Sequence, residues 1–358
     1  MIASIRRMAV EQKSWLDDET FRAGVALCQA IPGASAMQMA AYVGLRTRGV
    51  AGAAVIYVGF GLPAFLMIVL LSAIYKQTHN LSIALSLFSG LQAIIVAIVA
   101  NAAVSFGKSY LKLGRDFAIG AFAAGMLIFG ISPFIVIILA AFMGIIIYRD
   151  QLIQPRPASL KKTPQTTVPL MLISSAAAIG FVLLYMLQRD LFDLAESMFR
   201  IDLFAFGGGF ASLPLMLNEV VDIRSWMDYQ TFMNGIALGQ ITPGPIVITA
   251  AFVGYILYGP IGCIVATLGI FLPSFLVLIG TVPYYDRLSS SPRFNRAVNG
   301  ILCSFVGLLG SVAFHFASNM PGDIAHTIMA VAAFIILLLG VDILWVILAG
   351  AVISLFAL

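Results

Sequence analysis

Long apolar runs follow one another along almost the whole of this chain. One helical crossing of a lipid bilayer needs about 20 mostly apolar residues, and the sequence supplies many such runs. Hydrophobic residues make up 61% of the 358 residues and charged residues only 10%, which leaves too little polar surface for a water-soluble fold. Because lipid offers no hydrogen-bond partners to the backbone, the sequence predicts an all-α polytopic membrane protein.

One polar stretch, Arg149–Thr167, is rich in basic residues and prolines, and we expect it to be a linker between two groups of runs. Just before it, Phe117–Gly130 and Pro133–Tyr148 are shorter than most of the others and predict a helical hairpin. The remaining runs lie at Phe21–Gly44, Gly49–Tyr75, Leu81–Phe106, Val168–Leu187, Ile201–Leu217, Thr231–Leu257, Ile261–Val282, Ala297–Ala317, His326–Gly340 and Val341–Leu358.

The two halves of the sequence repeat each other at an offset of about 210 residues. So many matches in one register indicate an internal duplication. The matching pairs include Ser14-Trp15-Leu16-Asp17 with Ser225-Trp226-Met227-Asp228, Pro32-Gly33 with Pro243-Gly244, Leu62-Pro63 with Leu272-Pro273, and Gly130 with Gly340.

The number of runs between equivalent elements predicts that the repeats are inverted. Seven steps lead from Phe21–Gly44 to Thr231–Leu257, and an odd number of crossings reverses the orientation, as in many secondary transporters. We expect a first repeat at 1–148, a cytoplasmic linker with a connecting helix at 149–190, and a second repeat at 191–358. The same count places Arg46, Arg48, Lys108, Lys112, Arg115, Arg224, Arg287, Arg293 and Arg296 on the cytoplasmic side, and Arg6, Arg7, Lys13, Arg189 and Arg200 outside.

The most informative motif occurs twice, as Gln29-Ala30-Ile31-Pro32-Gly33 and as Gln240-Ile241-Thr242-Pro243-Gly244-Pro245. Proline removes a backbone donor and glycine adds freedom, so each motif should break its helix midway along an apolar run. A break exposes a helix N-terminus, whose free N–H groups and positive dipole favour an anion. We therefore predict an anion site with added hydroxyls from Ser35, Thr242 and Thr249; the alternative is a pair of packing kinks.

A glycine-rich segment, Phe206-Gly207-Gly208-Gly209-Phe210, interrupts another run. It either allows close helix packing or forms an unwound stretch that lines the same site. Asp202 and Glu219 flank this run, and both a functional and an interfacial role are open. No nucleophile–base set and no metal-ligand spacing stand out, so we expect neither an enzyme nor a cofactor, and the scattered basic residues argue against nucleic acid.

At these residues the sequence resembles the chromate ion transporter family, two-domain bacterial type. The resemblance rests on Leu27 through Gly33, Leu62-Pro63, Phe206 through Gly209, Gln240 through Pro245 and Leu272-Pro273, and it covers nearly the whole chain. It implies a multi-pass protein of the bacterial cell inner (plasma) membrane that exports chromate, or handles a similar oxyanion such as sulfate. Proton coupling and a homodimer are left open. The expected substrate-binding residues are Gln29, Pro32, Gly33, Ser35, Phe206, Gly207, Gly208, Gly209, Gln240, Thr242, Pro243, Gly244 and Pro245.

The sequence departs from this family pattern in two places. Ala34 stands opposite Pro245, so the first motif is Pro-Gly-Ala rather than Pro-Gly-Pro. Members like this usually begin with a Phe-Gly-Gly span, and Met1 lies where that span ends, so we expect the first repeat to lack it. Two alternatives to a carrier stay open, a membrane-embedded anion channel and an accessory membrane subunit without transport activity of its own.

Overall fold

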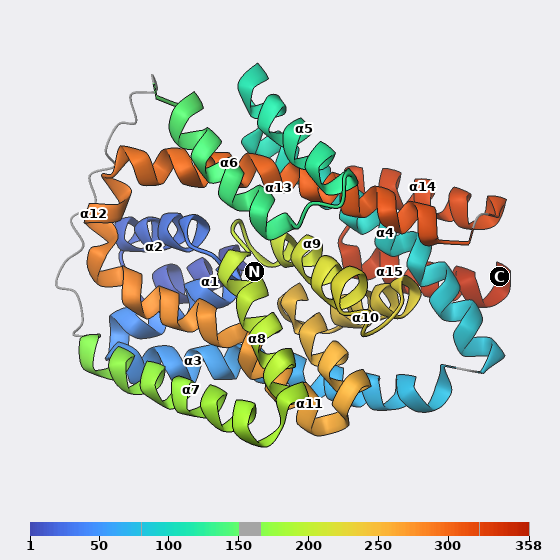
Figure 1. Cartoon of the computed structure of the whole chain (residues 1–358), viewed down its shortest axis with the longest axis horizontal. Coiled ribbons are helices and arrows are strands. Elements are labelled where there is room, and N and C mark those ends of the chain that lie inside the picture. Colours follow the sequence, from blue (N-terminus) through green and yellow to red (C-terminus); the bar gives the residue numbers. More distant parts are fainter. Residues whose placement is uncertain (80, 150–165, 322, 358) are drawn as a thin grey trace.

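The computed structural model describes residues 1–79, 81–149, 166–321 and 323–357. Regular structure in these ranges is helical, and one isolated antiparallel bridge joins Pro32 to Phe206. Within them, five helices are long and apolar enough to cross a membrane, which confirms a multi-pass membrane protein (Figure 1). They are α3 (Ser35–Thr78), α4 (Ser82–Tyr110), α7 (Thr167–Leu187), α11 (Thr249–Thr281) and α13 (Pro292–Asn319).

Two of the long helices, α3 and α11, bend sharply at equivalent positions. Gly49 has φ 66° and ψ −159°, and Gly259 has φ 63° and ψ −150°, a left-handed conformation that glycine adopts at little cost. Glycines on both sides let the backbones touch, because a Cβ on Gly44 would collide with the Gly52 carbonyl group. Each bend therefore separates a short leg (residues 35–47 and 249–257) from a long leg (residues 50–78 and 260–281).

Helix α2 (Asp18–Ala30) and the short leg of α3 form a hairpin. The Tyr42 hydroxyl donates to the Thr20 carbonyl oxygen at 3.4 Å, and the Tyr42 ring packs directly on Gly24. In the second half, α10 (Tyr229–Ile241) packs in the same way on the short leg of α11, with Phe252 against Gly235. The expected single spans Phe21–Gly44 and Thr231–Leu257 are therefore wrong, because each Pro-Gly pair reverses the chain instead of kinking it.

A third hairpin is built around the glycine-rich segment. It joins α8 (Arg189–Phe204) to η2 (Gly209–Ala211), α9 (Ser212–Leu217) and η3 (Asn218–Ile223). Ser197 donates to the Glu219 carboxylate at 3.2 Å, and Arg200 pairs with the same carboxylate at 2.6 Å. The turn uses positive φ at Gly207 (92°) and Gly208 (109°). The expected span Ile201–Leu217 is therefore wrong as well.

Two further hairpins of apolar helices complete the fold, the first packed on α13 and the second on α4. The first, α5 (Gly114–Ile128) with α6 (Pro133–Ile147), confirms the hairpin expected before the linker. The second is α14 (Ile324–Leu338) with α15 (Ile343–Ala357). Gly130 and Gly340 turn them with φ 74° and 88°. The shorter elements are α1 (Ile2–Arg6), η1 (Arg7–Gln12), η4 (Ile246–Ile248), η5 (Val282–Tyr284) and α12 (Tyr285–Ser289).

Backbone details repeat between the halves and support the duplication. The π-helical segments η1 and η3 are equivalent, and Ser14 and Ser225 share a φ of 49°. Asp17 and Asp228 each cap the next helix, accepting from the backbone N–H of Thr20 or Thr231 at 2.7 Å. These shared irregularities follow from the two halves having one ancestral backbone.

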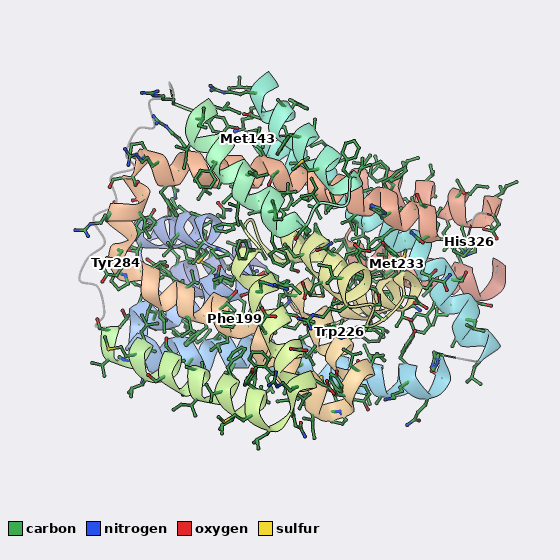
Figure 2. The ribbon with its side chains drawn as sticks, in the orientation of Figure 1. Met143, Phe199, Trp226, Met233, Tyr284 and His326 are labelled. Carbon is green, nitrogen blue, oxygen red and sulfur yellow. The ribbon has the colours of Figure 1, made fainter. Side chains whose placement is uncertain are left out.

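The repeats are inverted, although the crossings differ from those expected. Each hairpin returns to its own side, so α3, α4 and α7 are the crossings between the α2 hairpin and the α10 hairpin. The number of crossings is odd, so the α2 hairpin and the α10 hairpin enter the bundle from opposite ends (Figure 1). Tyr284 and His326 mark the two ends of the bundle (Figure 2).

Because of the hairpins, several basic residues lie on the side of the membrane opposite to the one expected from the sequence. Arg224 contacts Glu219 at 2.8 Å beside α8, at the end where α7 finishes, so its expected placement with the linker is wrong. The segment before α2 lies on the side of the α3 bend, because a hairpin starts and ends on one side. Arg6, Arg7 and Lys13 therefore lie on the linker side and not opposite it.

Candidate functional site

The tips of the three hairpins meet at the centre of the bundle. We call residues 31–34 tip 1, residues 242–245 tip 2 and residues 205–208 tip 3. The Gly33 N–H donates to the Ala205 carbonyl oxygen at 2.8 Å, beside the bridge that links tips 1 and 3. Gly209, just after tip 3, packs on Ile246, just after tip 2. The structure thus confirms both predicted helix breaks and brings them to one place with the glycine-rich segment.

Tip 1 is held by a buried polar cluster. The Ala34 N–H donates to Ser274 Oγ at 3.3 Å, and Ser274 Oγ donates to Asp202 Oδ2 at 2.6 Å. The Ser274 N–H donates to the same Asp202 oxygen at 2.8 Å. Gln38 Nε2 donates to the Pro32 carbonyl oxygen at 2.6 Å. Asp202 is 0% exposed, so the interfacial alternative for this residue is wrong.

Sequence reasoning missed two members of this cluster, Gln38 and Ser274. A weak signal existed, because Ser274 follows the paired Leu272-Pro273 motif directly. Gln38 lies one turn after the first helix break and could have been noticed as a polar residue in an apolar run. Only the fold shows that these two side chains share one tip.

Tip 2 has apolar and more open surroundings. Gly244 faces Ala64, whose Cβ lies 2.6 Å from the position a Cβ on Gly244 would occupy. Pro243 is exposed, and with Gly244 it lines a cavity of about 450 Å³ that also contacts Met1 and Phe60. Pro245 is buried behind them.

The expected hydroxyl groups differ in their availability. Thr242 donates to the Gly239 carbonyl oxygen at 2.6 Å, and Thr249 donates to that of Ile246 at 2.8 Å. Their protons are therefore used within their own segments. Ser35 Oγ and Gln240 Nε2 are buried atoms with no hydrogen-bond partner in the described part of the chain, so both are free to donate. Gly208 lies next to Ser35.

Gln29 lies at the edge of the tips, where it is exposed in a cavity of about 450 Å³ between α2, α12 and α13. Its polar neighbours there include Lys112, Asn295 and Asn299. Gln240 lies on the last turn of α10, which approaches the centre from the opposite end. The two glutamines are thus equivalent in sequence and lie on opposite approaches to the tips.

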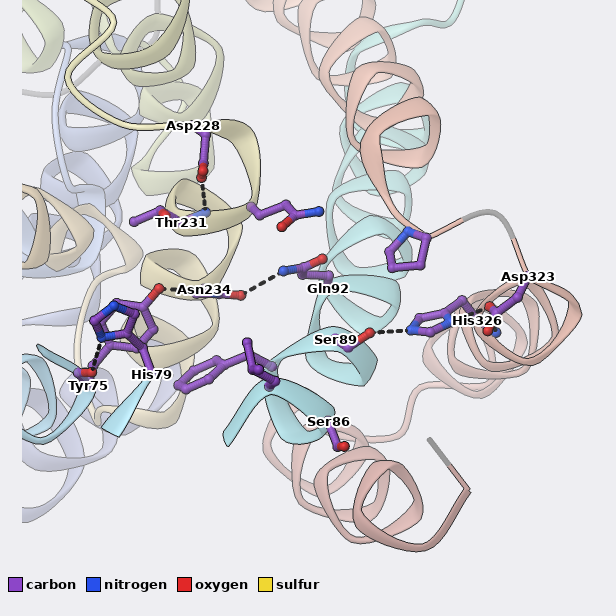
Figure 3. Close-up of a pocket in the computed structure, with 14 residues that line it drawn as sticks. Tyr75, His79, Ser86, Ser89, Gln92, Asp228, Thr231, Asn234, Asp323 and His326 are labelled. Atoms are coloured by element: carbon purple, nitrogen blue, oxygen red, sulfur yellow. Dashed lines mark hydrogen bonds and ion pairs between the residues drawn. The ribbon is translucent and has the colours of Figure 1, made fainter. Parts of the chain in front are cut away.

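A second polar cavity, of about 520 Å³, lies at the end of the bundle where α10 begins (Figure 3). Across it, Gln92 Nε2 donates to Asn234 Oδ1 at 3.0 Å, and Asn234 Nδ2 donates to the Tyr75 hydroxyl at 3.2 Å. Ser89 contacts His326 at 2.6 Å, and His326 pairs with Asp323.

The two polar cavities occupy equivalent places in the two repeats. Tyr75, Leu85, Phe88, Ser89 and Gln92 line the α10-side cavity, and their equivalents line the α2-side cavity. These equivalents are Tyr285, Asn295, Val298, Asn299 and Leu302. Because the repeats are inverted, the cavities approach the tips from opposite sides of the membrane.

The remaining ionisable candidates lie outside the tips. Glu219 is 1% exposed and is paired with Arg200 and Arg224, which makes it part of a structural ion-pair network. His315 is half-buried on α13. Among the described residues, no group of three or more His, Cys, Asp or Glu side chains could hold a metal ion.

Comparisons with known proteins identify the family. A family model described as chromate transporter matches residues 1–145 and 192–355. The chain belongs to the chromate transporter family. An uncharacterized transporter of Methanocaldococcus jannaschii is 41% identical, over 99% of this chain and 88% of that protein. Chromate transport proteins of Pseudomonas aeruginosa and Cupriavidus metallidurans are 29% and 28% identical, over 88% and 93% of this chain and 76% and 82% of theirs. No solved structure matches the chain.

Proposed function

We propose that this chain is a secondary transporter, and not an enzyme, for a tetrahedral oxyanion such as chromate or sulfate. The observation that carries the proposal is the meeting of unwound tips at the centre of two inverted repeats. Carriers of this architecture bind their substrates near the bilayer midplane, at half-helix ends. Membership of a family that includes chromate transport proteins supports the choice of anion.

The donors at the tips suit an oxyanion. The first amides of a helix lack partners within that helix and favour negative charge. The short leg of α3 begins just after tip 1, and η4, which leads into α11, begins just after tip 2. Ser35 Oγ and Gln240 Nε2 add donors without a partner in the described residues. We propose that these groups, with Gly208 and Gly244, contact the anion.

We propose that the linker side of the protein faces the cytoplasm, in the cell inner (plasma) membrane. Basic residues are enriched on the cytoplasmic side of membrane proteins. The described basic residues on the side away from the linker are Lys76, Arg189, Arg200 and Arg224. Those on the linker side are Arg6, Arg7, Lys13, Arg22, Arg46, Arg48, Lys108, Lys112, Arg115, Arg149, Arg287, Arg293 and Arg296.

The two polar cavities support alternating access. The α2-side cavity extends along the last turn of α2 as far as Ala30, next to tip 1. The α10-side cavity is lined by Asp228 and Asn234 near the start of α10, and the Tyr75–Asn234–Gln92 chain spans it. We propose that this conformation is open to the linker side, and that rocking residues 1–148 against 191–358 opens the other cavity.

The test is uptake of radiolabelled chromate into vesicles that contain the purified protein, with unlabelled sulfate as competitor. We expect saturable uptake that is inhibited by sulfate. Gln240→Ala removes a free donor at the tips and should lower uptake about tenfold, since a hydrogen bond to a charged group contributes about 1.5–3 kcal/mol. Gly180→Ala is the matched control, because Gly180 in α7 has no atom within 4 Å of an added Cβ.

The same vesicles distinguish a carrier from a channel. Preloading with unlabelled chromate should speed uptake of the label through a carrier, because the loaded site returns faster than the empty one. With the membrane voltage clamped by potassium and an ionophore, an ion channel shows no such acceleration. If vesicles with folded wild-type protein show no uptake, the transporter proposal is wrong and the accessory-subunit alternative replaces it.

A further inference from the structure

The Asp202 carboxyl group is a buried ionisable group at the tips to which the proposed transport function assigns no role. It lies in the last turn of α8, beside tip 3, and is 0% exposed. Its Oδ2 accepts two hydrogen bonds from Ser274, while its Oδ1 has no hydrogen-bond partner among the described residues. A carboxylate at membrane depth is costly, so an incompletely bonded one indicates a role beyond packing.

Within the described part of the chain, the helices packed around Asp202 bring no compensating charge to it. Helices α7, α9, α10 and α11, as bounded above, carry no Asp, Glu, Lys or Arg. From α3, the titratable group beside it is Tyr57, whose hydroxyl donates to the Phe271 carbonyl oxygen at 2.8 Å. On α8 itself, Arg200 pairs with Glu196 and Glu219.

Two other buried carboxylates, Glu219 and Asp116, have partners that stabilise their negative charge. Glu219 is held by Arg200 at 2.6 Å and by Arg224 at 2.8 Å. Asp116 accepts from the Tyr148 hydroxyl at 2.7 Å and from two backbone N–H groups before α5 at 2.8 and 2.9 Å. Asp202 has neither a cation nor donors to both of its oxygens, so its charged form is the least supported of the three.

The charge on Asp202 is linked to the tip that faces the proposed anion. Ser274 Oγ donates to Asp202 and at the same time accepts from the Ala34 N–H, at the start of the short leg of α3. Gln38 ties the Ser274 and Pro32 carbonyl oxygens together. A change in the protonation of Asp202 therefore changes how Ser274 holds tip 1.

We propose that Asp202 is the proton-binding site that couples anion movement to proton movement, an inference that rests on the transport function proposed above. One proton adds to Oδ1 on one side of the membrane and leaves it on the other, so the carboxylate and the carboxylic acid interconvert without any redox step. A neutral carboxyl group repels a dianion less than a carboxylate does. The proton and the anion therefore bind together and move in the same direction.

The geometry suits a proton better than a metal cation. A metal ion needs several oxygen ligands at once. The carbonyl oxygens of Pro32 and Ser274 already accept from Gln38, and Ser274 Oγ is engaged on both sides. Oδ1 of Asp202 is left as one free acceptor, which is enough for a proton.

The test uses vesicles that contain the full chain and a trapped pH-sensitive dye, with the membrane voltage clamped by potassium and an ionophore. Chromate is added outside at an alkaline pH, where it is a dianion, and uptake of the label is followed in parallel. We expect the wild-type interior to acidify as chromate enters, in the presence or absence of sodium. Asp202→Asn should still exchange labelled for unlabelled chromate, and its acidification per chromate should fall at least tenfold.

Two further variants keep the result interpretable. Ser274→Ala retains the carboxyl group but breaks its link to tip 1, and should lower the ratio of protons to chromate even where Asp202→Asn folds poorly. Asp116→Asn, at a buried carboxylate whose partners lie away from the tips, should keep the wild-type ratio. Wild-type chromate uptake without acidification, or acidification retained in Asp202→Asn, would overturn the proposal. A wild type without any chromate flux would instead overturn the transport function on which it rests.

Discussion

Tips 1 and 2 descend from the same Pro-Gly motif, yet their surroundings differ. Gly33 of tip 1 faces Ser274, while its equivalent, Gly244 of tip 2, faces Ala64, the equivalent of Ser274. Gln38, which binds tip 1, is replaced by the buried Ile248 beside tip 2. Tip 1 is enclosed by hydrogen bonds, and tip 2 is open to a cavity.

The difference indicates that the two repeats kept the same backbone conformation at their tips, while the side chains around the tips diverged. Both tips keep the helix break and the close glycine contact, because these depend on local sequence and on steric fit. The polar cluster of tip 1 also needs Ser274 and Gln38, and the equivalents of these two residues beside tip 2 are apolar. We infer that tip 1 controls coupling and that tip 2 is the more accessible anion contact.

Gly33→Ala should have the largest effect on this comparison. Gly33 has φ 114°, and a Cβ there would collide with Ser274 Oγ. Left-handed strain and overpacking together should lower the free energy of unfolding by about 3 kcal/mol. Thermal unfolding of the purified protein measures this loss, with Gly59→Ala as the control, since Gly59 has open space around it. Equal stability of the two variants would contradict the rigid description of tip 1.

Exchanging the residues opposite the two glycines should have the next largest effect. Ser274→Ala leaves the Ala34 N–H unpaired and removes a donor to Asp202, which should cost about 2 kcal/mol. Ala64→Ser places a hydroxyl near Gly244 without a matching carboxylate and should cost about 1 kcal/mol. Denaturation midpoints report both values. The comparison would fail if the two substitutions were equally tolerated.

The α10-side cavity should open when its hydrogen-bond chain is cut. Asn234→Ala removes both links between Gln92 and Tyr75 and should shift the balance between conformations by about 1 kcal/mol, or about fivefold. The measurement is the labelling rate of a cysteine introduced as Gln230→Cys, with an impermeant maleimide added to the α10 side. The three native cysteines are buried, so background labelling should be low. An unchanged rate would show that this chain does not close the cavity.

The smallest expected effect concerns acid stability at the mouth of the same cavity. Hydrogen bonds from His326 hold the pKa of the Asp323 carboxyl group below its usual value. A carboxyl group with a lowered folded-state pKa stabilises the fold above its ordinary pKa, and this contribution is lost as pH falls through the folded value. The wild-type melting temperature should therefore fall slightly more than that of Asp323→Asn between neutral and acidic pH. Parallel curves for the two proteins would argue against this link.

Local residues predicted much of the architecture. Apolar runs identified the long helices, and two short runs joined by Ile131-Ser132 predicted the α5–α6 hairpin, because run length and turn residues are local features of the sequence. The helix breaks at Pro32 and Pro243 were predictable for the same reason, since proline cannot continue the backbone ladder. The assignment of Phe21–Gly44 to one crossing failed, because a broken helix can continue or reverse, and long-range packing of Tyr42 on Gly24 decides between them.

Three properties of this protein could be read without any tertiary contact: that it is a membrane protein, that it is duplicated, and where its helices break. Hydropathy and proline sterics act over a few residues, and the duplication is visible from direct comparison of the two halves. Tertiary structure decided that the breaks are hairpin tips and that Asp202, Ser274 and Gln38 surround only one of them. Residues 202 and 274 lie far apart in sequence, and no local rule relates them. Their contact depends on α8 packing along α11, so only the folded chain brings a carboxylate to the tip of a helix.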